Sequence, residues 1–231
     1  METMVSGTSL TYNNEGSDDP KSPYYCRRPY VPGADNASGV TLGKGYDMKE
    51  KSVEKIKTDL TSAGLTSEQA ELLSKASKLH GHAAREFVKK TDVQKIEITE
   101  DQEIKLFNIS YVGLRDDVRR ICEKADVTAK YGACNWNNVD AGIREYVVDL
   151  RYRGDYTPAI RRLIQKAIVS NDYDTLISVA KVRSHWGNVD SNRFNERIRY
   201  LQNAAVKYKS LLSPQQKILL PLRDDVRTNW F

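Results

Sequence analysis

The sequence predicts a mostly helical α+β protein in which a small lobe of loop and short β-hairpin precedes a larger helical lobe. Four of the seven prolines lie in one short stretch, at positions 20, 23, 29 and 32, and proline cannot sit inside a helix. After Met48 no proline occurs before Pro158, and apolar residues recur at helical spacing. The small lobe is therefore expected at residues 1–60 and the helical lobe at residues 61–231.

The helical lobe contains a series of amphipathic segments. The clearest runs from about Glu100 to Lys124, where apolar residues form one face and Thr99 with Gln102 supplies a capping box. Four further helices are predicted by the same spacing, over residues 139–154, 157–168, 173–180 and 194–208.

Charge and hydropathy exclude a membrane-spanning protein. No window approaches the roughly 18 consecutive apolar residues of a membrane span. The N-terminus carries an acid where a signal peptide carries bases, so export by a cleaved signal is not expected. Thirty-six Lys and Arg against 31 Asp and Glu give a net charge of +5, which favours an anionic partner such as nucleic acid, a lipid surface or cell wall.

The cysteines and histidines give no sign of a metal or disulfide framework. Cys26, Cys122 and Cys134 are few and widely spaced, and none belongs to a Cys-x-x-Cys pair, so they fit a reduced compartment. Cys122 lies on the apolar face of the long helix and is expected to be buried. The histidines are too isolated for a metal site. Neither a metal nor an organic cofactor is expected.

The run from Ser38 to Asp47 holds the first candidate site residues. In one extended strand Thr41 and Asp47 would lie roughly 20 Å apart, too far to share a water molecule. Gly43 and Gly45 can take the positive φ of a tight turn, which would bring Thr41 and Asp47 together across a hairpin. The alternative is an ordinary hairpin with a surface Asp.

Glu15 is the second candidate. It follows a short segment with Val5 and Leu10, and if that segment is a helix, Gly16 is its natural stop. A carboxyl at the negative end of a helix dipole is disfavoured as the anion, and a general acid needs that property. The alternative is a solvated Glu in a loop. An acid and a base on either side of a cleft are what hydrolysis of a glycosidic bond requires.

These residues resemble a known family. Glu15-Gly16, followed by GVTLGKGYD at 39–47, resembles the catalytic region of phage-type lysozymes, and Thr six residues before Asp is most similar to the pesticin-type muramidases. The resemblance extends over about residues 5–205, through segments 98–108, 141–154 and 181–197. The stretch between Glu15 and Thr41 is longer than in that family, and a tail follows Ala205.

The resemblance implies a lysozyme-like two-lobed fold forming one domain, and a muramidase that cuts the β-1,4 bond between N-acetylmuramic acid and N-acetylglucosamine. Carried onto this sequence, the resemblance makes Glu15 the general acid. Asp47 positions water or stabilises positive charge on the sugar, and Thr41 also binds that water. Asp149 and Tyr152 are the expected sugar contacts on the floor of the cleft. No metal is implied. Peptidoglycan is the expected partner of a monomeric enzyme, with a cognate immunity protein if the chain is an interbacterial toxin.

An alternative hypothesis for the function belongs to another class of protein. A basic, Tyr-rich helical module could hold nucleic acid or a cell-wall polymer without cutting it. Glu15 distinguishes the hydrolase from the binding module, because a carboxylate in the cleft would repel the anions that such a module binds. A hydrolase of peptidoglycan made in the cytoplasm, whether phage endolysin or toxin, would reach the wall by a route other than a signal peptide.

Overall fold

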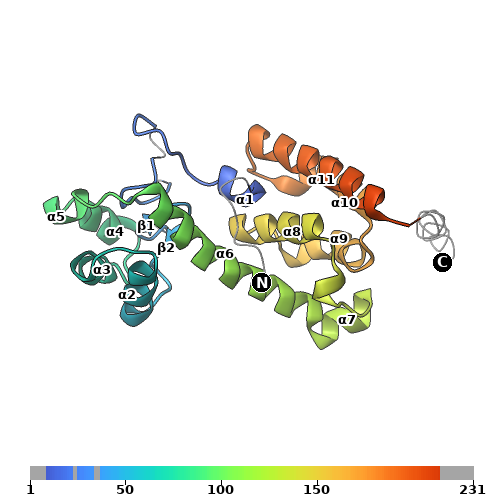
Figure 1. The fold of residues 1–231 in the computed structure, drawn as a ribbon, viewed down its shortest axis with the longest axis horizontal. Helices are drawn as coiled ribbons and strands as arrows, with labels where there is room; N and C mark the ends of the chain where they lie inside the picture. The colour runs from blue at the N-terminus through green and yellow to red at the C-terminus, as the bar shows by residue number, and fades with distance from the viewer. Residues whose placement is uncertain (1–8, 23–24, 34–36, 214–231) are drawn as a thin grey trace. The chain divides into compact units, whose positions relative to one another are not determined.

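The computed structural model describes residues 9–22, 25–33 and 37–213. They form a mostly helical structure with one two-stranded antiparallel sheet, as the sequence predicts (Figure 1). The chain divides into two compact units, Met1–Asp116 and Asp117–Phe231. Each unit has its own core and is described by itself.

The first unit contains short helices, the hairpin and most of one long helix. Its elements are α1 (Leu10–Asn13), β1 (Thr41–Leu42), β2 (Tyr46–Asp47), α2 (Val53–Ser62), α3 (Ser67–Ser74), α4 (Gly81–Val88), α5 (Thr91–Gln94) and the start of α6 (Glu100–Glu123).

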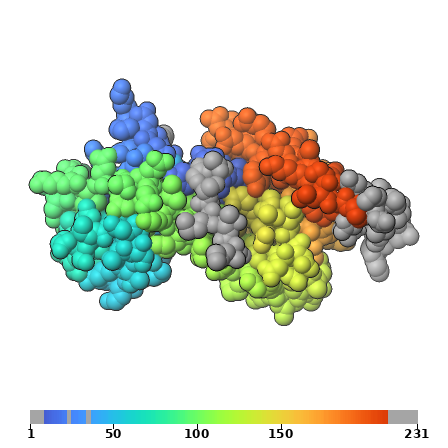
Figure 2. All heavy atoms as spheres, in the orientation of Figure 1, coloured from blue at the N-terminus to red at the C-terminus, as the bar shows by residue number. Residues whose placement is uncertain are grey.

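One apolar core joins the hairpin to the helices that follow it. Leu42, Tyr46 and Met48 from the hairpin region are buried in the same cluster as Ile56 of α2 and Leu106 of α6. In Figure 2 the spheres of α2 to α5 form a continuous mass in this unit. The first unit therefore extends to residue 116. The boundary expected at residue 60 differs, because apolar residues of α2 to α5 are buried in the same cluster as those of the hairpin.

The hairpin forms with the expected register. Thr41 pairs with Asp47 and Leu42 with Tyr46. Gly43 and Gly45 have φ values of 60° and 90°, in the left-handed region that glycine enters at little cost. The prediction that these two glycines reverse the chain is confirmed.

Helix α6 begins where the capping box predicts. Gln102 N–H donates to Thr99 Oγ1 at 3.2 Å, and Thr99 N–H donates to Gln102 Oε1 at 2.9 Å. Val118 and Cys122 are both buried, as the apolar face requires. The helix ends at Glu123, within the second unit.

The described part of the second unit contains helices joined by short loops and no strand. Its elements after α6 are α7 (Ala125–Tyr131), η1 (Trp136–Asn138), α8 (Ala141–Arg153), α9 (Pro158–Ser170), α10 (Tyr173–Lys181), η2 (Arg183–Trp186) and α11 (Ser191–Leu211).

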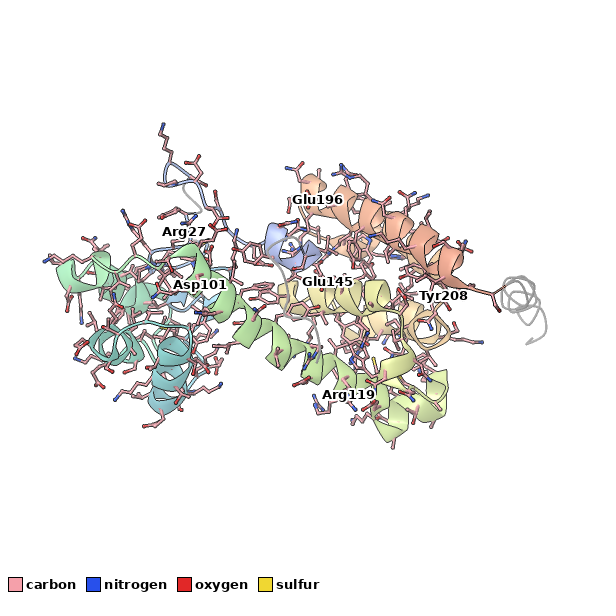
Figure 3. All side chains as sticks on the ribbon, viewed as in Figure 1. Arg27, Asp101, Arg119, Glu145, Glu196 and Tyr208 are labelled. Carbon is pink, nitrogen blue, oxygen red and sulfur yellow. The ribbon has the colours of Figure 1, made fainter. Side chains whose placement is uncertain are left out.

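The ends of these helices follow from local chemistry. Gly154, at φ 89°, closes α8, and the Thr157 side chain caps the N-terminus of α9 ahead of Pro158. Helices α10 and α11 pack together, with the rings of Tyr173 and Tyr208 5.5 Å apart (Tyr208 is labelled in Figure 3). The four helices predicted after residue 138 are confirmed.

Two findings concern the limits of the described chain. Val5, expected in the same helix as Leu10, lies outside the described residues, and so does Pro214 beyond α11. Within the described part of the chain, no helix combines the length and apolar character that a membrane span needs.

Candidate active site

Three side chains line up across the small sheet of the first unit. Tyr30 exchanges both backbone hydrogen bonds with Thr41, at 2.9 and 2.8 Å. Thr41 therefore faces Asp47 as a non-hydrogen-bonded pair, the arrangement in which opposed side chains approach most closely. Directly opposed residues point to the same face of a sheet. Tyr30, Thr41 and Asp47 thus form one row.

The Asp47 carboxylate is held from one side. Its Oδ1 accepts a hydrogen bond from Lys49 N–H at 2.8 Å. Among the described residues, no hydrogen-bond donor is found for Oδ2, and the side chain is partly exposed. One oxygen is therefore fixed by the protein, and the other is available to a ligand.

Gly39 leaves the space that this carboxylate occupies. A Cβ placed on Gly39 would lie 2.3 Å from Asp47 Oδ1 and 2.5 Å from Lys49 Cβ. Real Cβ atoms do not come so close to other heavy atoms, so only glycine fits beside the Asp47 carboxylate in this position.

We expect Gly39→Ala to lower the free energy of unfolding by about 1 to 3 kcal/mol, because the added methyl group must displace the carboxylate or the strand. Gly113→Ala is the matched control. Gly113 lies on an exposed turn of α6 where a Cβ meets nothing within 4 Å, so alanine there should add about 0.5 to 1 kcal/mol. Urea unfolding of both variants measures the difference, and equal stabilities would contradict the close packing at Gly39.

Glu15 follows the short helix α1. The Ser9 side chain caps the helix by accepting from Tyr12 N–H at 3.1 Å, and Gly16 takes the left-handed φ of 63° that turns the chain away. Glu15 N–H bonds back to Tyr12 O at 3.3 Å. The side chain of Glu15 is half-buried. Its position directly after Asn14, the C-cap of α1, agrees with the short helix expected before Gly16.

The hydroxyl of Tyr30 lies in the field of both candidate catalytic acids. Burial raises its pKa most, and electrostatic interaction with Cys26, Glu15, Glu103 and Asp47 raises it further. Such charge effects act over short range in a folded protein. Glu15 and Asp47 therefore both act on the ionisation of the Tyr30 hydroxyl, and the sheet pairs Tyr30 with Thr41 and Thr41 with Asp47.

A buried carboxyl on α6 holds the segment that carries Glu15. Glu103 is fully buried, and its Oε2 accepts from Tyr12 Oη at 3.2 Å while its Oε1 accepts from Cys26 Sγ at 3.0 Å. The Tyr12 ring packs edge-on against Phe107, with centroids 5.1 Å apart. Lys44, in the hairpin turn, lies 4.6 Å above the same ring. Glu103 thereby links α1, the hairpin turn and α6.

Glu103 and Asp18 shift each other's pKa in opposite directions. Burial, followed by a hydrogen bond to Asp18, raises the pKa of Glu103. Burial opposes ionisation of Asp18 as well, but hydrogen bonds from Glu103 and Lys44 outweigh it and lower the pKa of Asp18. The surroundings therefore favour the neutral form of Glu103 and the charged form of Asp18, which lies 3.0 Å from Lys44 and 3.5 Å from Arg27, labelled in Figure 3.

The same cluster is the place where a metal would be considered. Asp18, Cys26 and Glu103 are the group of possible ligands that the described residues bring within 4.8 Å of one another. Burial and the hydrogen bond to Glu103 raise the pKa of the Cys26 thiol to about 12, so it keeps its proton. With Lys44 already supplying the positive charge, the arrangement is a hydrogen-bonded cluster and does not fit a cation.

Glu103, Tyr12 and Tyr30 are not among the residues expected from the sequence. For Glu103 a signal exists, because it lies four positions before Phe107 on the apolar face of α6. A carboxyl in that place must find hydrogen-bond partners when the helix is buried. The sequence around Glu103 does not show which residues these hydrogen-bond partners are.

Asp149 and Tyr152 belong to the second unit, whereas Glu15, Thr41 and Asp47 belong to the first. Asp149 is fully buried, and its two oxygens accept from Arg193 Nη2 at 2.7 Å and Arg197 Nε at 2.6 Å. A sugar in solvent cannot reach this carboxylate. The expectation that Asp149 contacts substrate is therefore corrected: its role is to join α8 to α11. Tyr152 is half-buried on α8, and its contact with sugar stays a prediction.

Comparison with known proteins adds a family and no activity. None of the curated proteins matches the chain. Residues 8–198 match a family described as "Domain of unknown function (DUF8812)", and this match spans the candidate site and both compact units up to the middle of α11. The chain is therefore a member of the DUF8812 family.

Proposed function

We propose that this protein is a peptidoglycan hydrolase of the muramidase type, with Glu15 as general acid and Asp47 and Thr41 as the residues that hold the attacking water. The observation that carries the proposal is the cross-strand pair of Thr41 and Asp47. Next to Thr41 in the sheet stands Tyr30, whose pKa is raised in part by electrostatic interaction with Glu15 and Asp47. We further propose a two-lobed lysozyme-like fold, in line with the resemblance of the sequence to phage-type lysozymes.

In this mechanism Glu15 donates a proton to the glycosidic oxygen as the bond to the sugar breaks. Positive charge then develops on the sugar ring, and the Asp47 carboxylate stabilises it. Lys49 N–H fixes one oxygen of Asp47, so the carboxylate need not reorient during the reaction. Glu15 thus supplies the proton, and Asp47 stabilises the positive charge on the sugar.

Thr41 is almost fully buried, at 2% exposure, so in this proposal its hydroxyl accepts a hydrogen bond from a water molecule enclosed beside Asp47. Its own proton points to Gly39 O, 3.4 Å away, which leaves its lone pairs to accept a hydrogen bond. A water molecule that donates one hydrogen to Thr41 and the other to Asp47 Oδ2 directs a lone pair outward. That lone pair attacks the anomeric carbon, and the Asp47 carboxylate takes the proton that the water loses.

Digestion of purified peptidoglycan followed by mass spectrometry of the soluble fragments tests the proposal. A muramidase releases disaccharide peptides that end in reducing N-acetylmuramic acid. Anhydro-muramic ends would mean a lytic transglycosylase, and reducing N-acetylglucosamine ends a glucosaminidase. Retention on the insoluble wall with no soluble product would favour the binding module and overturn the hydrolase.

We expect the hydrolysis to proceed with inversion. An inverting enzyme keeps its two carboxyl groups roughly 6.5 to 9.5 Å apart with water between them, whereas a retaining enzyme needs about 5 Å for direct attack. The Thr41 hydroxyl beside Asp47 can bind the attacking water of an inverting enzyme. A retaining enzyme, in which Asp47 would attack the sugar directly, does not need this water in its first step. Proton NMR at early times should detect the α-anomer. Initial β-anomer, or a glycosyl adduct trapped on Asp47, would contradict inversion.

The proposal extends to the biological partner. A cell-wall hydrolase used against other bacteria requires protection of its producer, so a cognate immunity protein is part of the toxin version of the proposal. An endolysin needs none. Co-expression with neighbouring reading frames, scored by survival when the hydrolase is directed to the cell wall, separates these two versions.

A further inference from the structure

A hollow in the surface of the first unit lies beside the candidate active site. Its volume is about 410 Å³, and its walls are formed by Ala37, Lys49, Glu50, Lys78 and His80. Two of these five side chains are lysines and a third is a histidine, whereas one is an acid. Ligand sites in proteins have volumes of this order, so the hollow is large enough for part of a substrate.

Backbone hydrogen bonds hold together the three segments that form these walls. Lys78 N–H donates to Lys49 O at 3.2 Å. Gly39, two residues after the first wall residue, forms an antiparallel bridge with His80. The fold therefore fixes the hollow, because each segment that lines it is bonded to another.

The hollow carries positive charge. Lys49 is half-buried, and its Nζ donates one of its three hydrogens to Ala37 O at 2.8 Å. Glu50 Oε1 lies 3.8 Å from the same Nζ, but the Glu50 side chain is 80% exposed, so water screens this pair. Within the described part of the chain, no acid forms an ion pair with Lys78. Both lysines can therefore attract an anion.

The N-terminus of α4 adds to this positive potential. His80 lines the hollow and directly precedes α4. No side chain caps this end of the helix, and its first turn contains no acid. The N–H groups of a first helical turn have no partners within the helix, and the helix dipole is positive there. An anion in the hollow would be stabilised by both effects.

Lys78 has an unusual backbone conformation. Its φ of 64° lies in the left-handed region, where Asn171 at the end of α9 is the other described residue that is not glycine. Asn enters this region more readily than Lys does. Lys78 is exposed, so burial does not account for a lysine at this turn. A side chain kept on a strained backbone is a feature of functional sites.

We propose that this hollow is a subsite for a carboxylate of the peptide attached to N-acetylmuramic acid, with Lys49, Lys78 and the N-terminus of α4 as its donors. The choice of ligand rests on the proposed hydrolase function. Lys49 belongs to both sites, because its N–H donates to Asp47 Oδ1 at 2.8 Å while its side chain lines the hollow. A peptide of two residues extends about 7 Å, so a sugar bound at Asp47 can place its peptide carboxylate in the neighbouring hollow.

Such a subsite would distinguish between polysaccharides with similar backbones. Chitin and peptidoglycan both contain β-1,4-linked N-acetylglucosamine, but chitin carries no peptide and no carboxylate. Binding of the peptide carboxylate by Lys78 would favour peptidoglycan. The contact lies away from the bond that is cut, so it strengthens substrate binding more than it accelerates the chemical step.

The test is to titrate the full chain with N-acetylmuramoyl-L-alanyl-D-glutamate, which carries two carboxylates and no bond that the proposed hydrolase cuts. Backbone amide signals in NMR spectra report where the ligand binds. We expect shifts at Lys49, Lys78 and Gly81, and weaker binding at higher salt because the attraction is between charges. The neutral sugar N-acetylglucosamine should leave Lys78 and Gly81 unshifted.

Lys78→Asn separates binding from folding. It should weaken binding of the dipeptide ligand by roughly 3- to 10-fold. It should also raise the midpoint of thermal unfolding by roughly 2 to 4 °C, because Asn adopts a positive φ with less strain. Lys75→Asn is the matched control, since Lys75 is an exposed lysine at the end of α3 outside the hollow, and it should leave the affinity unchanged.

Two results would overturn the proposal. Equal affinity of the parent and Lys78→Asn for the dipeptide ligand would mean that Lys78 binds no carboxylate. An absence of shifts around the hollow in the parent would mean that the ligand does not bind there. Both measurements are independent of hydrolysis, so a chain that binds the ligand in the hollow but releases no fragments from cell walls would support the subsite and contradict the hydrolase.

Discussion

Glu15→Gln is expected to lower the rate of peptidoglycan hydrolysis by roughly 10³-fold, the contribution of a positioned general acid. Gln keeps the shape of the side chain and its position after α1 but has no acidic proton for the leaving oxygen. The Tyr12–Glu103 hydrogen bond that holds α1 does not involve Glu15, so the fold should persist. Clearing of wall suspensions measures the rate, and thermal unfolding measures the stability.

Glu54→Gln is the matched control for this variant. Glu54 is an exposed acid in the first turn of α2, in the same unit, and its loss should leave the hydrolysis rate unchanged. We expect the stability of Glu15→Gln to equal or exceed that of the parent, because a carboxylate at a helix C-terminus interacts unfavourably with the dipole. A variant that is stable and still clears cell walls at the parent rate would remove Glu15 from the mechanism.

Asp47→Asn is expected to lower turnover by roughly 10²-fold, with little change in the affinity for intact walls. The amide preserves the size of the side chain and can still accept from Lys49 N–H. It no longer offers a negative charge to the sugar ring, and this charge matters in the transition state more than in the ground state. Separate measurement of wall binding and of kcat distinguishes these effects.

Two substitutions at Thr41 refine the same prediction. Thr41→Val keeps the β-branched shape in the strand and removes the hydroxyl, and it should lower kcat by roughly 10-fold. Thr41→Ser keeps the hydroxyl and should retain most of the activity. Loss of wall binding alone in Thr41→Val or Asp47→Asn would identify that residue as a sugar contact and contradict the water-holding role.

Much of the architecture could be predicted from short stretches of sequence. The Thr99–Gln102 capping box and the face from Phe107 to Cys122 predict α6 within one residue at its C-terminal end. Gly43 and Gly45 predict the hairpin that pairs Thr41 with Asp47. These features could be predicted because helix caps, helical periodicity and tight turns depend on interactions between residues only a few positions apart.

The lobe boundary and the role of Asp149 could not be predicted in the same way. Periodicity shows that a helix has an apolar face but not which surface that face covers. The sequence therefore could not predict that α2 to α5 share one apolar core with the hairpin. Asp149 and Tyr152, three residues apart, point in similar directions. Only the arrival of Arg193 and Arg197 from α11 buries Asp149 and removes it from reach of a ligand.

The sequence by itself determined the helices, their caps, the hairpin register and the identity of three candidate catalytic residues, because each depends on local spacing. The tertiary structure alone decided which distant groups meet: Glu103 with Tyr12, and Cys122 with Gln165. The physical reason is that a buried polar group must be satisfied by whatever partner the packing brings to it. That partner can come from any part of the chain, as Tyr12 does from 91 positions before Glu103.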